Sequence, residues 1–314
     1  MRSVESQLMH EITIPFHGRF VPNNKKKGMV IYMELFKPIN NNIISAIDDD
    51  GREVVIIGKG LGYKATPGAK IPQEKIDKVF VMSNQDNMDR LKDLFASLPT
   101  EYIELTDEIL TFAKTHLGKR LNEAAYFTLA DHISFAVTRY KQGIEFQNIL
   151  LQEVRRFYPK EYEVGMYALQ QMKEKLDVEM PKDEAASIAM HILHAEYDIS
   201  ISDAVQATQL MDQILTVVAN ETGYVMSGAS HYCERFFTHL RYLAQRVIQS
   251  EPLPKYHDDD FFKVLAVQYP KEMQCAELVS AMILQDHQYT LSKEEISRLT
   301  IHIKYIQPKT GGTD

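Results

Sequence analysis

The sequence contains few cysteines, and neither is placed as a metal ligand would be. Cys233 and Cys275 are the two cysteines among 314 residues. A disulfide framework is therefore excluded, which fits the reducing environment of a cytoplasm. The HExxH, HxxxH and CxxC spacings of common metal sites are also missing. We therefore expect a cytoplasmic protein with no resident metal and no cofactor.

Long apolar segments are missing as well. No apolar run approaches the roughly 18 residues that a membrane-spanning helix needs. The first 32 residues contain His17, two prolines and a lysine cluster, and they lack the apolar core of a signal peptide. We expect neither membrane insertion nor secretion.

Positive charge is scarce over most of the chain, whose net charge is −8. Residues 1–32 carry five basic and two acidic side chains, and residues 33–83 carry seven of each, so the excess of negative charge lies after residue 83. A large acidic region does not bind polyanions through bulk electrostatics. If nucleic acid is bound, its site must lie in the amino-terminal quarter.

Residues 33–83 have the pattern of a small sheet. Short runs rich in Val and Ile alternate with turn residues, and the sequence DDDG at 48–51 predicts a hairpin turn. A sheet of about fifty residues is small enough to need a partner that covers one of its faces. The segment GKGLG at 58–62 lacks the GK[ST] and GxGxxG patterns of phosphate-binding loops. The predicted strands are 33–39, 42–47, 52–58 and 78–83.

After Ser83 the apolar spacing becomes helical. Apolar residues recur at i, i+3, i+4 and i+7 in five segments, 91–98, 107–117, 125–140, 146–158 and 163–176. The predicted helix breaks are Pro99, Gly118, Gly143, Pro159 and Pro181.

This helical region contains an internal repeat. DEILT at 107–111 returns as DQILT at 212–216, and YPKE at 158–161 returns at 269–272. Offsets of similar size indicate that one supersecondary unit occurs twice. We therefore predict two homologous helical domains, at residues 97–203 and 204–310.

Four histidines are repeated with their surroundings. His132 and His239 are each followed by an arginine seven residues later, Arg139 and Arg246. His191 and His302 each lie thirty residues after the glutamate of YPKE, and each has a glutamate, Glu184 or Glu295, seven residues before it. A single histidine on an apolar helical face is usually a hydrogen-bonded core residue. Its recurrence in both copies favours a function.

Three chemical roles compete for these histidines. A metal site would need further ligands nearby, and the Asp131-His132 dipeptide is a poor hydrolytic dyad because adjacent helical side chains point in different directions. Reversible phosphorylation fits best, since a neutral imidazole is nucleophilic near pH 7. Cations such as Arg139 and Arg246 would stabilise the phosphoryl group.

At this point the chain resembles a known family, the BglG/LicT-type transcriptional antiterminators. The markers lie between residues 33 and about 310: KPINNNIISAIDDDGREVVIIGKGLGY, DHISFAVTR, AMHILHAEY, THLRYLAQRV and LTIHIKYI. The resemblance implies a multidomain protein. A small antiparallel all-β co-antiterminator (CAT) RNA-binding domain at 33–88 would precede two all-α helical bundles, the phosphotransferase-system regulation domains. Residues 1–32 fall outside the pattern, and we expect either a flexible tail or a start site assigned too far upstream.

The resemblance implies an RNA-binding homodimer without enzymatic activity. Such proteins stabilise an antiterminator hairpin in the leader mRNA of a sugar-utilisation operon, most commonly one for aryl-β-glucosides, and so prevent formation of the terminator. By position, the residues that would contact the hairpin are Lys37, Asn42, Gly58, Lys59 and Tyr63. Tyr63 would stack on an unpaired base.

Three neighbouring residues have other expected roles. Asn40 and Asn41 are expected mainly to shape the turn, although one of them could touch RNA. Pro38 lacks an N–H and should lie at a sheet edge or at an unpaired position of the ladder.

The same resemblance implies control by phosphorylation. His132 and His191 would mediate negative control that involves the sugar-specific permease, and His239 and His302 would receive phosphoryl groups from the carrier protein HPr. Arg139 and Arg246 would stabilise the phosphorylated state. Two alternatives remain open: a DNA-binding activator with the same regulatory domains, which would need a helix-turn-helix, and a phosphotransferase that passes phosphate to a small molecule.

Overall fold

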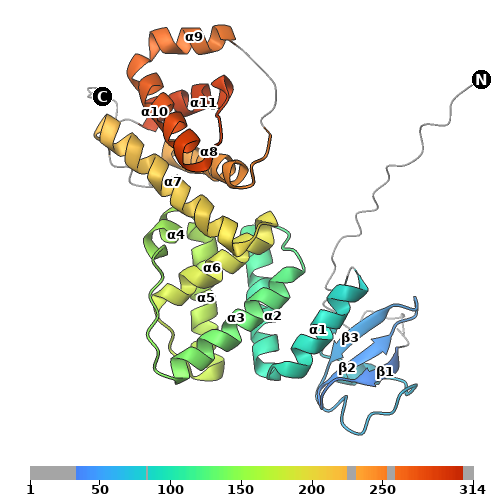
Figure 1. Ribbon diagram of the computed structural model, residues 1–314. Coiled ribbons are helices and arrows are strands. Elements are labelled where there is room, and N and C mark those ends of the chain that lie inside the picture. The colour runs from blue at the N-terminus through green and yellow to red at the C-terminus, as the bar shows by residue number, and fades with distance from the viewer. Residues whose placement is uncertain (1–32, 83, 225–230, 253–258, 307–314) are drawn as a thin grey trace, which may run out of the picture. The chain divides into compact units, whose positions relative to one another are not determined.

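The computed structural model describes residues 33–82, 84–224, 231–252 and 259–306 (Figure 1). The predicted amino-terminal extension, residues 1–32, lies outside the described residues. The chain divides into two compact units, Met1–Glu108 with Glu123–Val137, and Ile109–Asn122 with Thr138–Asp314.

The first unit contains the predicted four-stranded antiparallel sheet. Its strands are β1 (Glu34–Pro38), β2 (Ile43–Ile47), β3 (Glu53–Ile57) and β4 (Lys78–Phe80), in the order β1-β2-β3-β4. A short 3₁₀ helix, η1 (Gln73–Lys75), precedes β4. Pro38 ends the edge strand β1, as its missing N–H required. This sheet stands where a DNA-binding activator would need a helix-turn-helix.

Both faces of the sheet are buried within the chain. One face forms a core cluster around Leu35, Ile44, Val54 and Ile56. The alternate residues, Ile43, Val55 and Ile57 among them, are buried as well.

Helix α1 (Gln85–Ser97) covers the second face. Phe95 packs edge-to-face on Phe80 of β4 with ring centroids 5.3 Å apart, and Lys92 Nζ lies 2.9 Å from Glu53 Oε1 of β3. Figure 1 shows α1 beside the sheet. The expectation that a small sheet needs a separate partner for one face was therefore wrong, because the chain itself supplies the cover.

Local sequence explains where α1 begins and which side it buries. Asn84 is its N-cap, and its side chain accepts a hydrogen bond from the backbone N–H of Asn87 at 2.8 Å. Met88, Leu91 and Phe95 lie on one face of the helix and are buried. The helix continues past residue 88, the predicted end of the RNA-binding domain.

Ten helices follow α1 in the described residues, and they form two series of five. The first series is α2 (Thr100–Leu117), α3 (Ala124–Lys141), α4 (Leu151–Phe157), α5 (Pro159–Leu176) and α6 (Lys182–Tyr197). The second is α7 (Ile201–Thr222), α8 (His231–Ile248), α9 (Asp259–Gln268), α10 (Pro270–His287) and α11 (Lys293–Ile306). The two series agree with the predicted duplication of an all-α unit.

The predicted helix breaks are confirmed. Gly118 and Gly143 follow α2 and α3 with φ of +64° and +69°, a conformation that glycine adopts without strain. Pro159 is the first residue of α5, where its missing N–H costs nothing, and Pro181 is the N-cap of α6.

The predicted start of the helix at 146 was wrong, because α4 begins at Leu151. Asn148 lies in an irregular segment instead: its backbone N–H donates to Asp183 Oδ1 at 2.8 Å, and its Oδ1 accepts from the N–H of Leu150 at 2.9 Å. An asparagine that bonds its own backbone two residues on competes with helix formation.

One hydrophobic cluster runs through both helical series in the second unit. It extends from Leu150 of the first series to Ile306 of the second, and α7 contributes residues such as Leu210 and Ile214. Arg241 of α8 adds polar contacts to the first series. Its Nη2 donates to the carbonyl of Phe157 at 2.6 Å, and its Nη1 donates to the Tyr197 hydroxyl at 3.0 Å. The two repeats therefore share a core in this unit.

Candidate functional site

The predicted RNA-binding residues lie around two loops that are hydrogen-bonded to each other. Asn42 accepts the backbone N–H of Gly58 on its carbonyl at 2.8 Å and the N–H of Gly60 on Oδ1 at 2.9 Å. Gly62 donates to the carbonyl of Asn41 at 3.0 Å. The turn before β2 and the loop after β3 therefore form one rigid surface.

Several side chains project from this region. Lys37 and Lys59 are exposed, and Tyr63 is 64% exposed with Lys64 Nζ 5.4 Å from its ring centroid. An exposed aromatic ring with a lysine beside it offers a stacking surface and positive charge to a nucleic acid.

Gly58 and Asn40 have roles within the chain. A Cβ on Gly58 would collide with the carbonyl oxygen of Lys75, so a close approach of the protein's own backbone already requires glycine there. Asn40 shapes the turn, as predicted: its Oδ1 accepts the N–H of Asn42 at 2.9 Å, and its Nδ2 donates to the carbonyl of Phe95 at 3.0 Å. A contact between Gly58 and RNA stays a prediction.

In the second repeat, the structure brings two of the predicted histidines together. His239 on α8 and His302 on α11 stack with ring centroids 4.8 Å apart and an interplanar angle of 18°. The ring of Phe236 also stacks on His302, at 5.5 Å. Two histidines 63 residues apart in sequence therefore form one site.

A buried carboxylate, Glu295, organises this site. Its side chain is 5% exposed and lies 3.0 Å from His239 Nε2 and 2.9 Å from Arg246 Nη1. Arg298 Nη1 is 3.3 Å away. Burial acts to raise the pKa of Glu295, but the hydrogen bond and charge of His239 and the arginines outweigh it and lower that pKa. Glu295 is therefore ionised at neutral pH.

His302 differs electrostatically from an ordinary histidine. Burial, followed by the positive charges of His239, Arg235 and Arg298, lowers the pKa of His302 to about 4. Its ring is therefore neutral near pH 7 and keeps a nucleophilic lone pair.

In the first repeat, His132 on α3 and His191 on α6 are both half-buried. His132 belongs to the first compact unit and His191 to the second. Arg139 forms an ion pair with the buried Glu184, and its guanidinium lies 4.0 Å from the ring centroid of Phe146. Burial lowers the pKa of Arg139.

The two repeats thus share an arginine–glutamate pair that sequence reasoning missed. Arg139 pairs with Glu184, and Arg246 pairs with Glu295. The position of each glutamate seven residues before a histidine was visible in the sequence, but no role followed from it. The available indication was that this glutamate recurs on an apolar helical face in both repeats. A carboxylate buried on such a face requires a cation as its partner.

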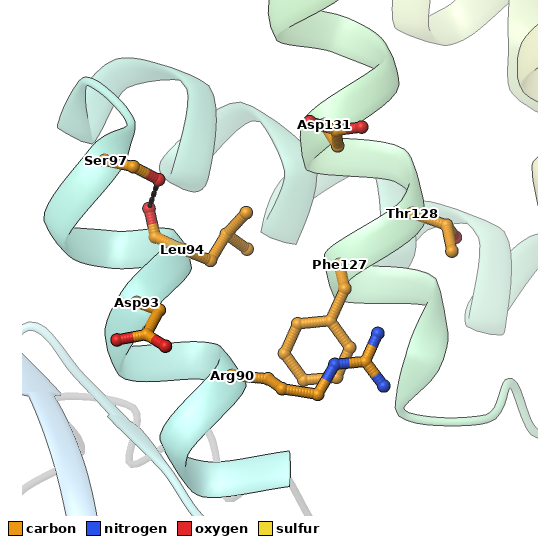
Figure 2. A pocket seen from close by; sticks show the side chains of 7 residues that line it. All are labelled: Arg90, Asp93, Leu94, Ser97, Phe127, Thr128 and Asp131. Carbon is orange, nitrogen blue, oxygen red and sulfur yellow. Dashed lines mark hydrogen bonds between the residues drawn. The ribbon is translucent and has the colours of Figure 1, made fainter. Parts of the chain in front are cut away.

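A surface groove of about 530 Å³ lies between α1 and α3 in the first unit (Figure 2). Arg90 lies over the ring of Phe127, with 4.8 Å between its guanidinium carbon and the ring centroid. Asp93 and Asp131 also line the groove and offset the arginine's charge, so it is not an anion site. The full lining is Arg90, Asp93, Leu94, Ser97, Phe127, Thr128 and Asp131.

Within the described residues, no cluster of three or more His, Cys, Asp or Glu side chains could hold a metal ion. No helix in the same part of the chain is both long and apolar enough to span a membrane.

Comparison with known proteins adds domain and family matches. The family described as CAT RNA binding domain matches residues 33–89, and the PRD domain family matches residues 107–195 and 212–306. The transcription antiterminator LicT of Bacillus subtilis is 34% identical over 87% of this chain and 99% of its own length. The β-glucoside operon antiterminator of Dickeya chrysanthemi is 34% identical over 88% of this chain and 97% of its own length.

A solved structure, described as the crystal structure of GlcT CAT-PRDI, is 28% identical and covers 52% of this chain and 98% of that one, with a TM-score of 0.47. The two relatives are named as antiterminators and not as enzymes, in agreement with the prediction that the chain is not an enzyme. The matched domains and the relatives together show that the chain belongs to the family of transcription antiterminators in which a CAT RNA-binding domain is followed by two PRD domains.

Proposed function

We propose that this antiterminator binds a hairpin in the leader mRNA of a sugar-utilisation operon, such as one for β-glucosides, through the surface around Asn42 and Tyr63. Binding would stabilise the hairpin and exclude the overlapping terminator, so that transcription continues into the operon. The protein would act in the cytoplasm, where the leader transcript is made. The observation that carries this proposal is the exposed Tyr63, with Lys64 Nζ 5.4 Å from its ring centroid, after a loop that Asn42 holds rigid and on which Lys59 is also exposed.

The test is binding of the full chain to the leader RNA upstream of the neighbouring operon, measured by gel shift. Tyr63→Ala should weaken binding about tenfold to a hundredfold, because stacking on one base contributes about 1–3 kcal/mol. Tyr305→Ala is the control, since Tyr305 is 57% exposed but lies on α11. Equal affinity of the Tyr63 variant and the unchanged chain, or tighter binding to duplex DNA than to the hairpin, would contradict the proposal.

We also propose that the RNA-binding form is a homodimer. Phe36 supports this, because it is 55% exposed on the edge strand β1 and adjoins Lys37. The outer edge of β1 is bonded to residues 68–71 of the same chain, so the support comes from the exposed apolar ring, which favours contact with another chain. Light scattering should show a smaller mass for Phe36→Ser than for the unchanged chain at micromolar concentration, and equal masses would remove this support.

Control is proposed to act through the four repeated histidines. His239 and His302 would accept phosphoryl groups from HPr, and His132 and His191 would mediate negative control through the sugar permease. The stacked His239–His302 pair, with Arg246 beside it, supports the first part. The repeat relation of His132 and His191 to this pair supports the second. Loss of HPr-dependent labelling in the double variant His239→Ala/His302→Ala would be expected, and unchanged labelling of the second repeat would refute it.

A further inference from the structure

The two histidines of the second repeat present different nitrogens to an incoming donor. His239 directs Nε2 at the ionised Glu295. A carboxylate accepts hydrogen bonds and cannot donate them, so Nε2 carries the hydrogen. When the ring is neutral, its lone pair is therefore on Nδ1; when the ring is charged, as in its ion pair with Glu295, neither nitrogen has a lone pair to offer. Nδ1 of His239 is buried and has no hydrogen-bond partner among the described residues.

A buried lone pair cannot reach a phosphorus atom on another molecule. Attack on phosphorus requires the nucleophile, the phosphorus and the leaving group to lie roughly in line at short distance. The Nδ1 of His239 has protein on the side from which the donor would have to approach, so this ring is protected while Glu295 holds it.

His302 lacks this restraint. It is half-buried and forms no hydrogen bond with any residue that the structure describes, and the rings of His239 and Phe236 stack on it. Its lowered pKa keeps the ring neutral. Arg298, one helical turn before it on α11, contributes positive charge at this ring, as does Arg235 of α8. Cations in that position stabilise a phosphoryl group.

We propose that His302 is the first phosphoryl acceptor of the second repeat, and that Glu295 is a positioning residue that protects His239 until this carboxylate is displaced. The proposal rests on the proposed phosphorylation of this repeat and assigns an order to it.

The lone pair of a His302 nitrogen forms a new N–P bond as the N–P bond of the carrier's phosphohistidine breaks. The electron pair of the broken bond stays on the carrier's imidazole, which takes up one proton. His302 gives up the N–H proton of its other nitrogen, so protons and charge are conserved, and no oxidant or other reactant is needed.

The phosphoryl group then acts on Glu295. It adds about two negative charges at neutral pH. Glu295 and His302 are seven residues apart on α11, about two turns, and so share a face of that helix. The new charge repels the carboxylate and competes with it for Arg298. Release of Glu295 frees His239 to turn and expose its lone pair, which makes His239 the second acceptor.

The experiment follows the early label on each histidine of the folded full chain. Two phosphoryl donors are used separately: phosphorylated HPr, and phosphoramidate, a small donor that needs no protein recognition. Peptides that contain His239 and His302 are quantified by mass spectrometry over time. We expect both donors to label His302 first, at a rate at least about tenfold that of His239. The hydrogen bond between His239 and the charged Glu295 must break before His239 can react, and the free energy of such a bond is enough to slow the reaction about tenfold.

Variants then separate the role of Glu295 from a general effect on folding. Glu295→Gln should speed labelling of His239 about tenfold. If Glu295 had only a structural role, its substitution would not shift label from His302 to His239. Glu277→Gln, which removes a carboxylate exposed on α10, is the matched control and should leave both rates unchanged. His239→Ala should keep the early label, and His302→Ala should lose it. Circular dichroism confirms that each variant is folded.

The possible results are distinct. Early label on His239 in the unchanged chain, or a His239 rate that Glu295→Gln does not alter, overturns the assigned order. Label on His302 from phosphoramidate but none from HPr overturns the proposed carrier and supports the protection of His239. If neither donor labels His302, both the proposed carrier and the protection of His239 by Glu295 are overturned.

Discussion

The neutral form of His302 makes the stability of the second repeat depend on pH. The pKa of His302 falls from an ordinary 6.5 to about 4 in the folded protein. Between these values the unfolded chain binds a proton that the folded chain excludes, so the free energy of unfolding rises with pH. The contribution of His302 is complete above pH 6.5 and is lost as the pH falls towards 4.

The size of the effect follows from the pKa difference. A shift from 6.5 to about 4 corresponds to a ceiling of about 3 kcal/mol, since one pKa unit is about 1.4 kcal/mol. His302 is only partly buried, and solvent screening lowers the expected change to about 2 kcal/mol. Glu295, whose pKa is lowered, adds a loss of stability only below its ordinary value of 4.5. Between pH 6.5 and 4.5 Glu295 therefore contributes little, and comparison with a variant that lacks the histidine cancels the titration of groups elsewhere in the chain, such as Glu161, whose pKa burial raises.

The perturbation is His302→Gln, which keeps a polar side chain and removes the titrating group. Urea unfolding is followed by circular dichroism at several pH values between 7.5 and 4.5, because the chain has no tryptophan to serve as a fluorescence probe. We expect the unchanged protein to lose about 2 kcal/mol more than the variant across this range.

The control for this measurement is His231→Gln, since the side chain of His231 is 95% exposed. That variant should keep the pH dependence of the unchanged protein. Parallel pH profiles for the unchanged protein and His302→Gln would refute the assignment of a neutral His302 in the folded state.

Three further predictions concern packing and buried charge. Gly58→Ala should lower stability by about 1–3 kcal/mol, because its methyl group meets the carbonyl of Lys75; a melting temperature equal to that of the unchanged chain would contradict this. Arg241→Met should cost about 3 kcal/mol and separate the unfolding of the two repeats in calorimetry, because it removes the bonds to Phe157 and Tyr197; a single unshifted transition would argue against it. Arg139→Met should cost about 3–5 kcal/mol in urea unfolding, because Glu184 loses its arginine partner; a change below about 1 kcal/mol would show that the ion pair contributes little.

Much of the architecture could be predicted from local patterns. Strands β1 to β4 followed from β-branched runs with a turn between them, and the helix ends at Gly118, Gly143 and Pro159 followed from backbone restrictions of single residues. The duplication was visible because both repeats keep the same motifs at nearly the same offset. The helix that the local pattern predicted at residues 146–150 was wrong, because Asn148 bonds to Asp183, which lies in a distant part of the chain.

The candidate sites divide in the same way. The sequence by itself determined which residues are repeated, and with them the histidines, the arginines and the positions of Glu184 and Glu295. It could not show that α1 covers the second face of the sheet, because that depends on Phe95 meeting Phe80 across a turn. Only the tertiary structure decided that Glu295 holds His239 while His302 stays unbonded and neutral. Hydrogen bonds and burial between α8 and α11 make the two histidines different. The spacing of residues along one helix carries no information about the contacts that this helix makes with another.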